Sequence, residues 1–150
     1  MHWLLSFVLV ACTVQSDSPP AIVARMWAQY AQFLIRHDVD ALADLYTVDA
    51  RLMEPNADDF VGREVIRLRL KIAFAQRVRT IDTRITPREV VGFNGLIYDQ
   101  GDYIETLAPL GDSRRATDVY GRYVALWAEQ TDGTWKLARM MVSAKKQPRP

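Results

Sequence analysis

The second half of the chain, from Val78 onward, constrains the fold most, because it consists of β-type segments separated by turn signals. The four segments are residues 79–93, 96–107, 116–130 and 135–145. The first two flank Asn94-Gly95, a dipeptide that favours the two-residue turn of a β-hairpin because both residues tolerate positive φ. The last two flank Thr-Asp-Gly-Thr at 131–134. The pattern predicts a long antiparallel meander, one face of which other elements must cover.

The first half is expected to supply that cover as three helices. Residues 22–37 have apolar side chains at spacings of three and four, which mark one helical face. Asp38 can cap a second helix over 39–46. Residues 50–54 precede a proline, which favours an extended backbone.

The segment 63–76 is ambiguous from its periodicity. Residues 66–72 alternate between apolar and polar like a half-buried strand, yet the same segment also carries a helical apolar stripe, and periodicity alone does not decide between them. We assign a helix because Ala73, Ala75 and Gln76 extend the segment with helix-favouring residues.

Size and charge define the broad class. With 150 residues and 49% apolar content, the chain fits one domain, expected over 21–145, with a basic tail at 146–150. Nineteen basic residues nearly balance eighteen acidic ones, so charge gives no case for a nucleic-acid partner.

The start of the chain differs from the rest. An apolar run within residues 1–12 has the length of a signal-peptide core, and Leu-Val-Ala-Cys at 9–12 resembles the lipidation motif of bacterial lipoproteins. We expect a leader ending at lipidated Cys12, a tether over 13–20, and an exported protein anchored in a membrane and facing the periplasm or cell exterior. An ordinary cleaved leader or an uncleaved hydrophobic N-terminus is the alternative. Cys12 is the only cysteine, so the domain holds no disulfide.

Three sequence features together resemble the nuclear transport factor 2-like superfamily, which includes ketosteroid isomerase and the SnoaL-like cyclases. They are Tyr30 in the first helix, Glu54-Pro55 after the short extended segment, and a closing hairpin around Asp132-Gly133. The resemblance covers the chain after Pro20. It implies an α+β fold, in which a cone-shaped, curved antiparallel sheet of four long strands and a short one packs on three N-terminal helices around a mostly apolar cavity.

The resemblance to ketosteroid isomerase also implies site residues. Tyr30 matches a tyrosine that donates to the substrate oxygen, and Glu54 matches the carboxylate that moves the proton. The isomerases carry a protonated aspartic acid on the third strand of the meander, where this chain has none, and Tyr123 is the candidate replacement. Further aromatic side chains are expected in the core or at the cavity wall: Trp27, Tyr46, Phe74, Tyr103, Tyr120 and Trp127.

These residues predict the binding of a small apolar molecule without a cofactor. A buried glutamate can act as a base near neutral pH, so an isomerase-, cyclase- or dehydratase-like proton transfer is one version of the function. His37 is the only histidine after the leader, so the domain has almost no histidine ligands for a metal site. The alternative is a non-catalytic assembly module that pairs through the open sheet face, and we expect a homodimer.

Overall fold

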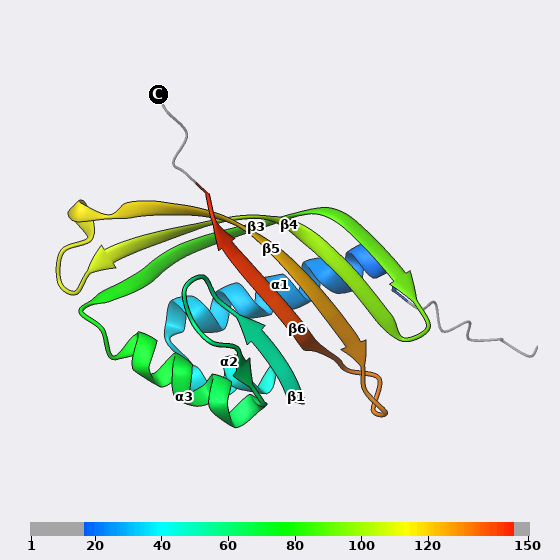
Figure 1. Ribbon diagram of the computed structural model, residues 1–150. Helices are drawn as coiled ribbons and strands as arrows, with labels where there is room; N and C mark the ends of the chain where they lie inside the picture. The colour runs from blue at the N-terminus through cyan, green and yellow to red at the C-terminus, as the bar shows by residue number, and fades with distance from the viewer. Residues whose placement is uncertain (1–16, 146–150) are drawn as a thin grey trace, which may run out of the picture.

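The computed structural model describes residues 17–145, and in this part of the chain three helices lie against one face of a curved sheet (Figure 1). The helices are α1 (Pro19–Arg36), α2 (Val39–Asp44) and α3 (Arg63–Phe74). The strands are β1 (Tyr46–Met53), β2 (Phe60–Val61), β3 (Val78–Phe93), β4 (Leu96–Pro109), β5 (Thr117–Glu129) and β6 (Trp135–Ala144). A single 3₁₀ turn, η1 (Ser113–Arg115), joins β4 to β5. The predicted α+β fold with three N-terminal helices is confirmed.

The sheet has the strand order β2-β1-β6-β5-β4-β3, with β3 to β6 forming the predicted antiparallel meander. One pair departs from the antiparallel pattern, because β1 runs parallel to β6. β1 follows α1 and α2 in the chain and lies in the sheet between β2 and the last strand, β6. β1 is also longer than the extended segment expected over 50–54: Tyr46 was expected at the end of the second helix and 47–49 in no element, but aromatic and β-branched residues such as Tyr46 and Thr47 favour strands.

The turn chemistry read from the sequence is present in the structure. Asn94 and Gly95 have φ values of 45° and 74°, and Phe93 pairs with Leu96 across a two-residue loop. Gly133, in the loop between β5 and β6, also has a positive φ of 79°. These local turns fix the register of the meander.

The helix ends follow capping rules. The Asp38 side chain accepts a hydrogen bond from the Ala41 N–H at 3.0 Å, as the sequence predicted. α1 begins at Pro19, three residues before the predicted start, because proline is well suited to the first helical turn. Thus the last two residues of the expected tether belong to α1, while the rest of the tether up to residue 16 lies outside the described residues.

Two tyrosine–glycine pairs shape the inner face of the sheet. Tyr103 on β4 is opposite Gly121 on β5, and Tyr123 on β5 is opposite Gly101 on β4. A Cβ atom on Gly121 would overlap the Tyr103 ring, and one on Gly101 would overlap the Thr86 backbone of β3 and lie 2.9 Å from the Tyr123 hydroxyl. The absent side chains therefore let both rings lie across the neighbouring strand, on the face that α1 covers.

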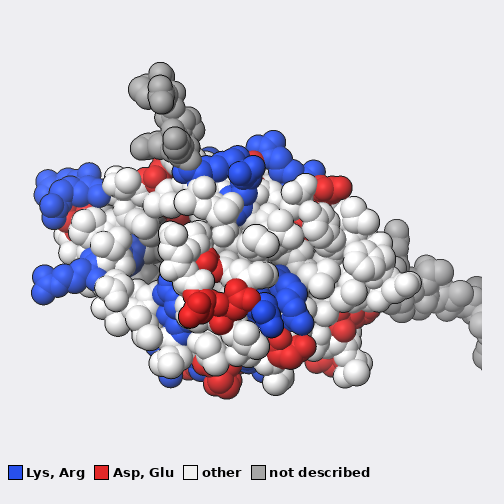
Figure 2. All heavy atoms as spheres, viewed as in Figure 1, with Lys and Arg blue, Asp and Glu red and all other residues white. Residues whose placement is uncertain are grey.

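Charged side chains of both signs are intermixed on the surface that carries β1 and α3 (Figure 2). Among residues 17–145, no helix has the length and apolar character needed to cross a membrane.

Candidate functional site

A cavity of about 410 Å³ lies between α1, α3 and the inner face of the sheet. This volume is within the range of small-molecule sites, roughly 300–1,000 Å³. Much of its wall is apolar, including Leu34, Leu52, Leu70, Phe74, Ile85 and Leu107. Polar side chains from α1, α3, β3 and β4, and from the residue after β1, also face it, so several groups that are distant in sequence converge on one space.

Tyr30, on α1, lines this cavity as predicted. Burial raises the pKa of its hydroxyl to about 12; a hydrogen bond with Tyr46 lowers the pKa, and the charges of Glu105 and Glu54 raise it. The hydroxyl therefore keeps its proton throughout the physiological range. It can donate a hydrogen bond to an oxygen of a bound molecule.

Glu54 follows the last residue of β1 and also lines the cavity, so the structure brings the predicted pair together. Its Oε2 atom accepts two hydrogen bonds from Arg69 of α3, from Nε at 2.9 Å and from Nη2 at 2.7 Å. The two side chains are only 23% and 31% exposed. The Arg69 guanidinium also lies 5.6 Å from the centre of the Phe60 ring. Glu54 is thus a carboxylate with a fixed cationic partner, which sequence reasoning missed.

Glu105, on β4, is a second carboxylate in the cavity that sequence reasoning did not select. Tyr103, Glu105 and Leu107 all line the cavity, because alternate residues of a strand share a face. Oε1 of Glu105 accepts a hydrogen bond from the Thr80 hydroxyl of β3. The alternation of side chains along the strand could have identified it. Tyr103 was already expected at the cavity wall, and Glu105, two residues further along, lies on the same face of the strand.

Tyr123 does not face the cavity, in contrast to its expected role as a second donor to the ligand. Its hydroxyl donates to Oδ1 of Asp99 at 2.9 Å. Trp27 and Trp127 donate their indole N–H groups to Oδ2 of Asp99, at 2.6 Å and 3.3 Å. Asp99 has no exposed surface, so these three expected pocket residues instead form a polar cluster in the core.

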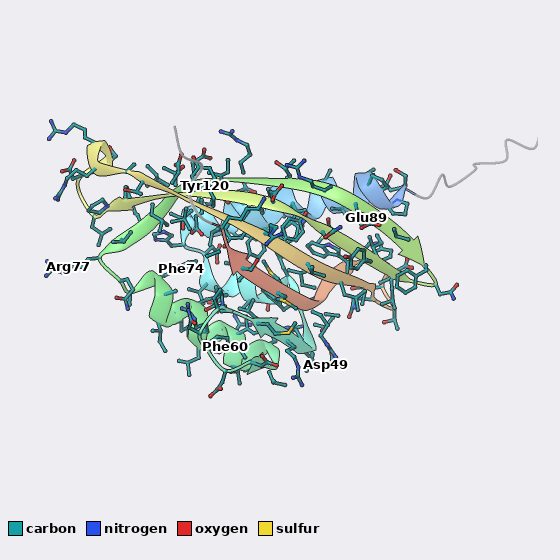
Figure 3. All side chains as sticks on the ribbon, turned by 45° about the horizontal axis from the view of Figure 1, so that its top comes forward. Asp49, Phe60, Phe74, Arg77, Glu89 and Tyr120 are labelled. Carbon is teal, nitrogen blue, oxygen red and sulfur yellow. The ribbon has the colours of Figure 1, made fainter. Side chains whose placement is uncertain are left out.

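The remaining predicted wall residues divide between three locations. Phe74 and Tyr103 line the cavity, and the Phe74 ring stacks on His37 with 4.7 Å between ring centres. Tyr46 is fully buried in the core next to Tyr30, and its hydroxyl lies 3.4 Å from the sulfur of Met140. Tyr120 pairs with Ile104 on the outer face of the sheet, because Gly121 and Tyr123 occupy the inward positions of β5 (Figure 3). Cys12, the predicted lipidation site, lies outside the described residues.

No protein-family model matches the chain, and no curated protein matches it in sequence. Solved structures do match. A ketosteroid isomerase-like protein from Erwinia carotovora atroseptica aligns with a TM-score of 0.72 at 21% identity, over 85% of this chain and 96% of that one. An NTF2-like protein with a cystatin-like fold from Novosphingobium aromaticivorans aligns with a TM-score of 0.69 at 12% identity, over 87% and 84%.

A protein of Novosphingobium aromaticivorans that is provisionally named a scytalone dehydratase is also similar. It has a TM-score of 0.68 at 17% identity, and the match covers 83% of each chain. At these identities the likeness concerns the fold and not the activity. The shared arrangement of helices and curved sheet shows that this chain has the nuclear transport factor 2-like fold.

Proposed function

We propose that the protein binds a small, mostly apolar molecule in the cavity between α1, α3 and the sheet. The observation that carries the proposal is the 410 Å³ cavity itself, which has apolar walls and a few convergent polar groups. Tyr30 supplies a neutral donor for a carbonyl or hydroxyl oxygen, because its raised pKa keeps the phenol protonated. The ligand class is therefore an apolar molecule with at least one oxygen.

The reaction that fits this site is a proton transfer next to a carbonyl group, as in an isomerase, cyclase or dehydratase. Such a transfer needs a carboxylate base and a donor that stabilises the oxygen of the enolate. Both kinds of group face the cavity. The relatives with isomerase-like and dehydratase-like names are consistent with this chemistry on the same fold.

Binding can be tested with 2-naphthol, a fluorescent bicyclic phenol, by titration of the purified protein. Ala73 lies on the cavity wall, so Ala73→Trp fills part of the space without changing a polar group. We expect this variant to weaken binding at least tenfold. The matched control is Ala75→Trp, two residues further along at the exposed C-terminal end of α3, which should bind as the native protein does. Equal affinity in both variants would show that the probe does not occupy the cavity.

A second candidate function is assembly through the outer face of the sheet. No helix among the described residues covers this face, and it carries the partly exposed apolar side chains Val124 and Met141, which are cross-strand neighbours. In this version the sheet face forms a homodimer. The cavity and the outer face are on opposite sides of the sheet, so the two functions are compatible.

We also propose that the protein is exported and anchored through a lipid on Cys12. The support is the apolar leader and the Leu-Val-Ala-Cys motif. Expression of the full chain in a bacterium, followed by mass spectrometry of the N-terminal peptide, tests this. A lipidated Cys12 at a new N-terminus is the expected result, and Cys12→Ala should remain unmodified. Native protein that retains residues 1–11, or that is cleaved elsewhere, would contradict the proposal.

A further inference from the structure

We propose that Glu105, and not Glu54, is the catalytic base of the cavity. The inference rests on the proposed proton-transfer function and assigns its key residue. Three observations support it: the partners of the two carboxylates, the position of Glu105 on β4, and the tyrosine hydroxyls nearby.

The two carboxylates differ in their partners. Arg69 donates two hydrogen bonds to Oε2 of Glu54, and such an ion pair stabilises the charged carboxylate. Protonation of Glu54 would remove the charge attraction between its carboxylate and the Arg69 guanidinium. Glu105 accepts a hydrogen bond from the neutral Thr80 hydroxyl, and no cationic side chain among residues 17–145 lies within ion-pairing distance of it. Of the two groups, Glu105 is therefore the one able to gain and lose a proton without breaking an ion pair.

The position of Glu105 directs its side chain to the ligand space. β4 alternates strictly here: Tyr103, Glu105 and Leu107 line the cavity, whereas Ile104 and Thr106 occupy the outward positions. Thr80, which is buried in the neighbouring β3, binds Oε1 and so holds the carboxylate in place. Oε2 of Glu105 has no protein donor among the described residues and is the oxygen available to a ligand.

The donors that the reaction needs are close by. Burial is the main reason that the pKa of both Tyr30 and Tyr103 is raised, so both phenols remain protonated. The negative charge of Glu105 raises each pKa further, and its effect on each is larger than that of Glu54. A ketone placed with its oxygen toward Tyr30 would present the neighbouring C–H bond to a carboxylate in this part of the cavity.

The chemical step balances without a cofactor. Oε2 of Glu105 removes a proton from the carbon next to the carbonyl, and the electron pair of the C–H bond forms the C=C bond of an enolate. The carbonyl π electrons move to the oxygen, which accepts a hydrogen bond from Tyr30. If the protonated Glu105 trades its proton for a deuteron of the solvent before it reprotonates the same carbon, the result is exchange; if it delivers the proton to a conjugated carbon, the result is isomerisation.

The test is hydrogen–deuterium exchange of 2-tetralone, a bicyclic ketone with acidic C–H bonds, followed by NMR in D₂O. The native protein should accelerate exchange above the buffer rate, and 2-naphthol should inhibit it. Glu105→Gln should lower the protein-catalysed rate by at least about a hundredfold, the usual contribution of a general base. Its 2-naphthol affinity should stay within a few fold of native, which also shows that the cavity remains folded. Glu105→Asp should retain partial activity because it keeps a carboxylate.

Two variants serve as comparisons. Glu54→Gln should reduce exchange by much less than Glu105→Gln. Glu89→Gln removes another β-strand glutamate, which lies outside the cavity toward the far end of β3 and accepts a hydrogen bond from Gln100 (Figure 3). This variant should catalyse the exchange of 2-tetralone at the native rate.

The outcomes separate this inference from the function on which it rests. A large loss in Glu54→Gln with native-like exchange in Glu105→Gln would overturn the assignment of Glu105 and leave proton transfer standing. If the native protein binds 2-naphthol but gives no exchange above buffer, then the role of Glu105 as a base is wrong and the binding function survives. Failure to bind either probe would contradict both proposals.

Discussion

At the scale of single residues, Asp99 is the most constrained polar group of the domain. It has no exposed surface and accepts hydrogen bonds from Trp27, Tyr123 and Trp127, which come from α1 and β5. The three rings also pack on one another, with edge-to-face contacts of 4.9 Å between Trp27 and each of the other two. The carboxylate therefore links the first helix to the middle of the sheet.

Replacing Asp99 with Leu should be strongly destabilising. The substitution leaves three buried N–H or O–H donors without an acceptor, and each such group costs about 1–3 kcal/mol. We expect the free energy of unfolding to fall by at least about 3 kcal/mol, measured by urea denaturation. Asp102→Leu, at an outward position of the same strand, is a control in which surface ion pairs are lost, and it should cost far less. Equal losses in the two variants would argue against the buried network.

Asp99 should also give the protein a characteristic pH dependence. Burial raises its pKa above the ordinary value of 3.8, although the three hydrogen bonds lower it. Because the folded pKa exceeds the unfolded one, the folded state holds the proton more tightly, and stability from this group declines as pH rises above about 4 through the folded pKa. Asp99→Asn cannot titrate. The native-minus-variant free energy of unfolding should therefore fall with rising pH and then level off. A difference that rises over that range would show that the folded pKa is lowered.

At the scale of elements, the β4–β5 pair positions a wall of the cavity. Tyr103 lies across Gly121 and so presents its ring to the ligand space, while Tyr123 lies across Gly101 and points to Asp99. The two tyrosines are on the same face of the sheet, but Tyr103 lines the cavity and Tyr123 lies in the core beside Asp99. Gly121 leaves room for the Tyr103 ring, whereas a side chain at Gly101 would overlap the Thr86 backbone and crowd the Tyr123 hydroxyl.

Gly121→Ala should move the Tyr103 ring and disturb the cavity. A methyl group there overlaps the ring, and such overpacking usually costs about 1–3 kcal/mol. We expect lower stability and weaker 2-naphthol binding. The double variant Gly121→Ala/Tyr103→Ala should be less destabilised than the sum of the two single variants, because the clash is then removed. Strictly additive effects, measured by urea denaturation, would show that the two residues are not coupled.

At the scale of the whole molecule, the sheet separates two surfaces with different surroundings. Its inner face and the helices enclose the cavity, and its outer face is left open by the described helices (Figure 1). Val124 is 37% exposed and Met141 is 47% exposed on that outer face. Single exposed apolar side chains are common, and the adjacency of Val124 and Met141 is what motivates the proposed contact with a second copy.

If the outer face forms a homodimer, Val124→Lys should shift the protein to a monomer, because a buried unpaired charge at an interface is unfavourable. Light scattering coupled to size-exclusion chromatography measures the molar mass. Val65→Lys, at an exposed position of α3 and not on the outer face of the sheet, should leave the mass unchanged. A native protein that is already a monomer would rule out the assembly function.

The sequence by itself determined the parts of this protein that depend on neighbouring residues. The Asn94-Gly95 hairpin, the Asp38 cap and the four-strand meander follow from local turn, cap and periodicity rules. Tyr30 and Glu54, the two residues that carry the resemblance, both line one cavity. The tertiary structure alone decided which long-range partner each polar group has. Trp27 meets Asp99 across 72 residues and Arg69 meets Glu54 across 15, and no local pattern encodes these contacts. Their pairing arises from how the helices pack on the curved sheet. This packing turns Tyr123 toward Asp99 and pairs Glu54 with Arg69, whereas Glu105 in the same cavity accepts only the Thr80 hydroxyl.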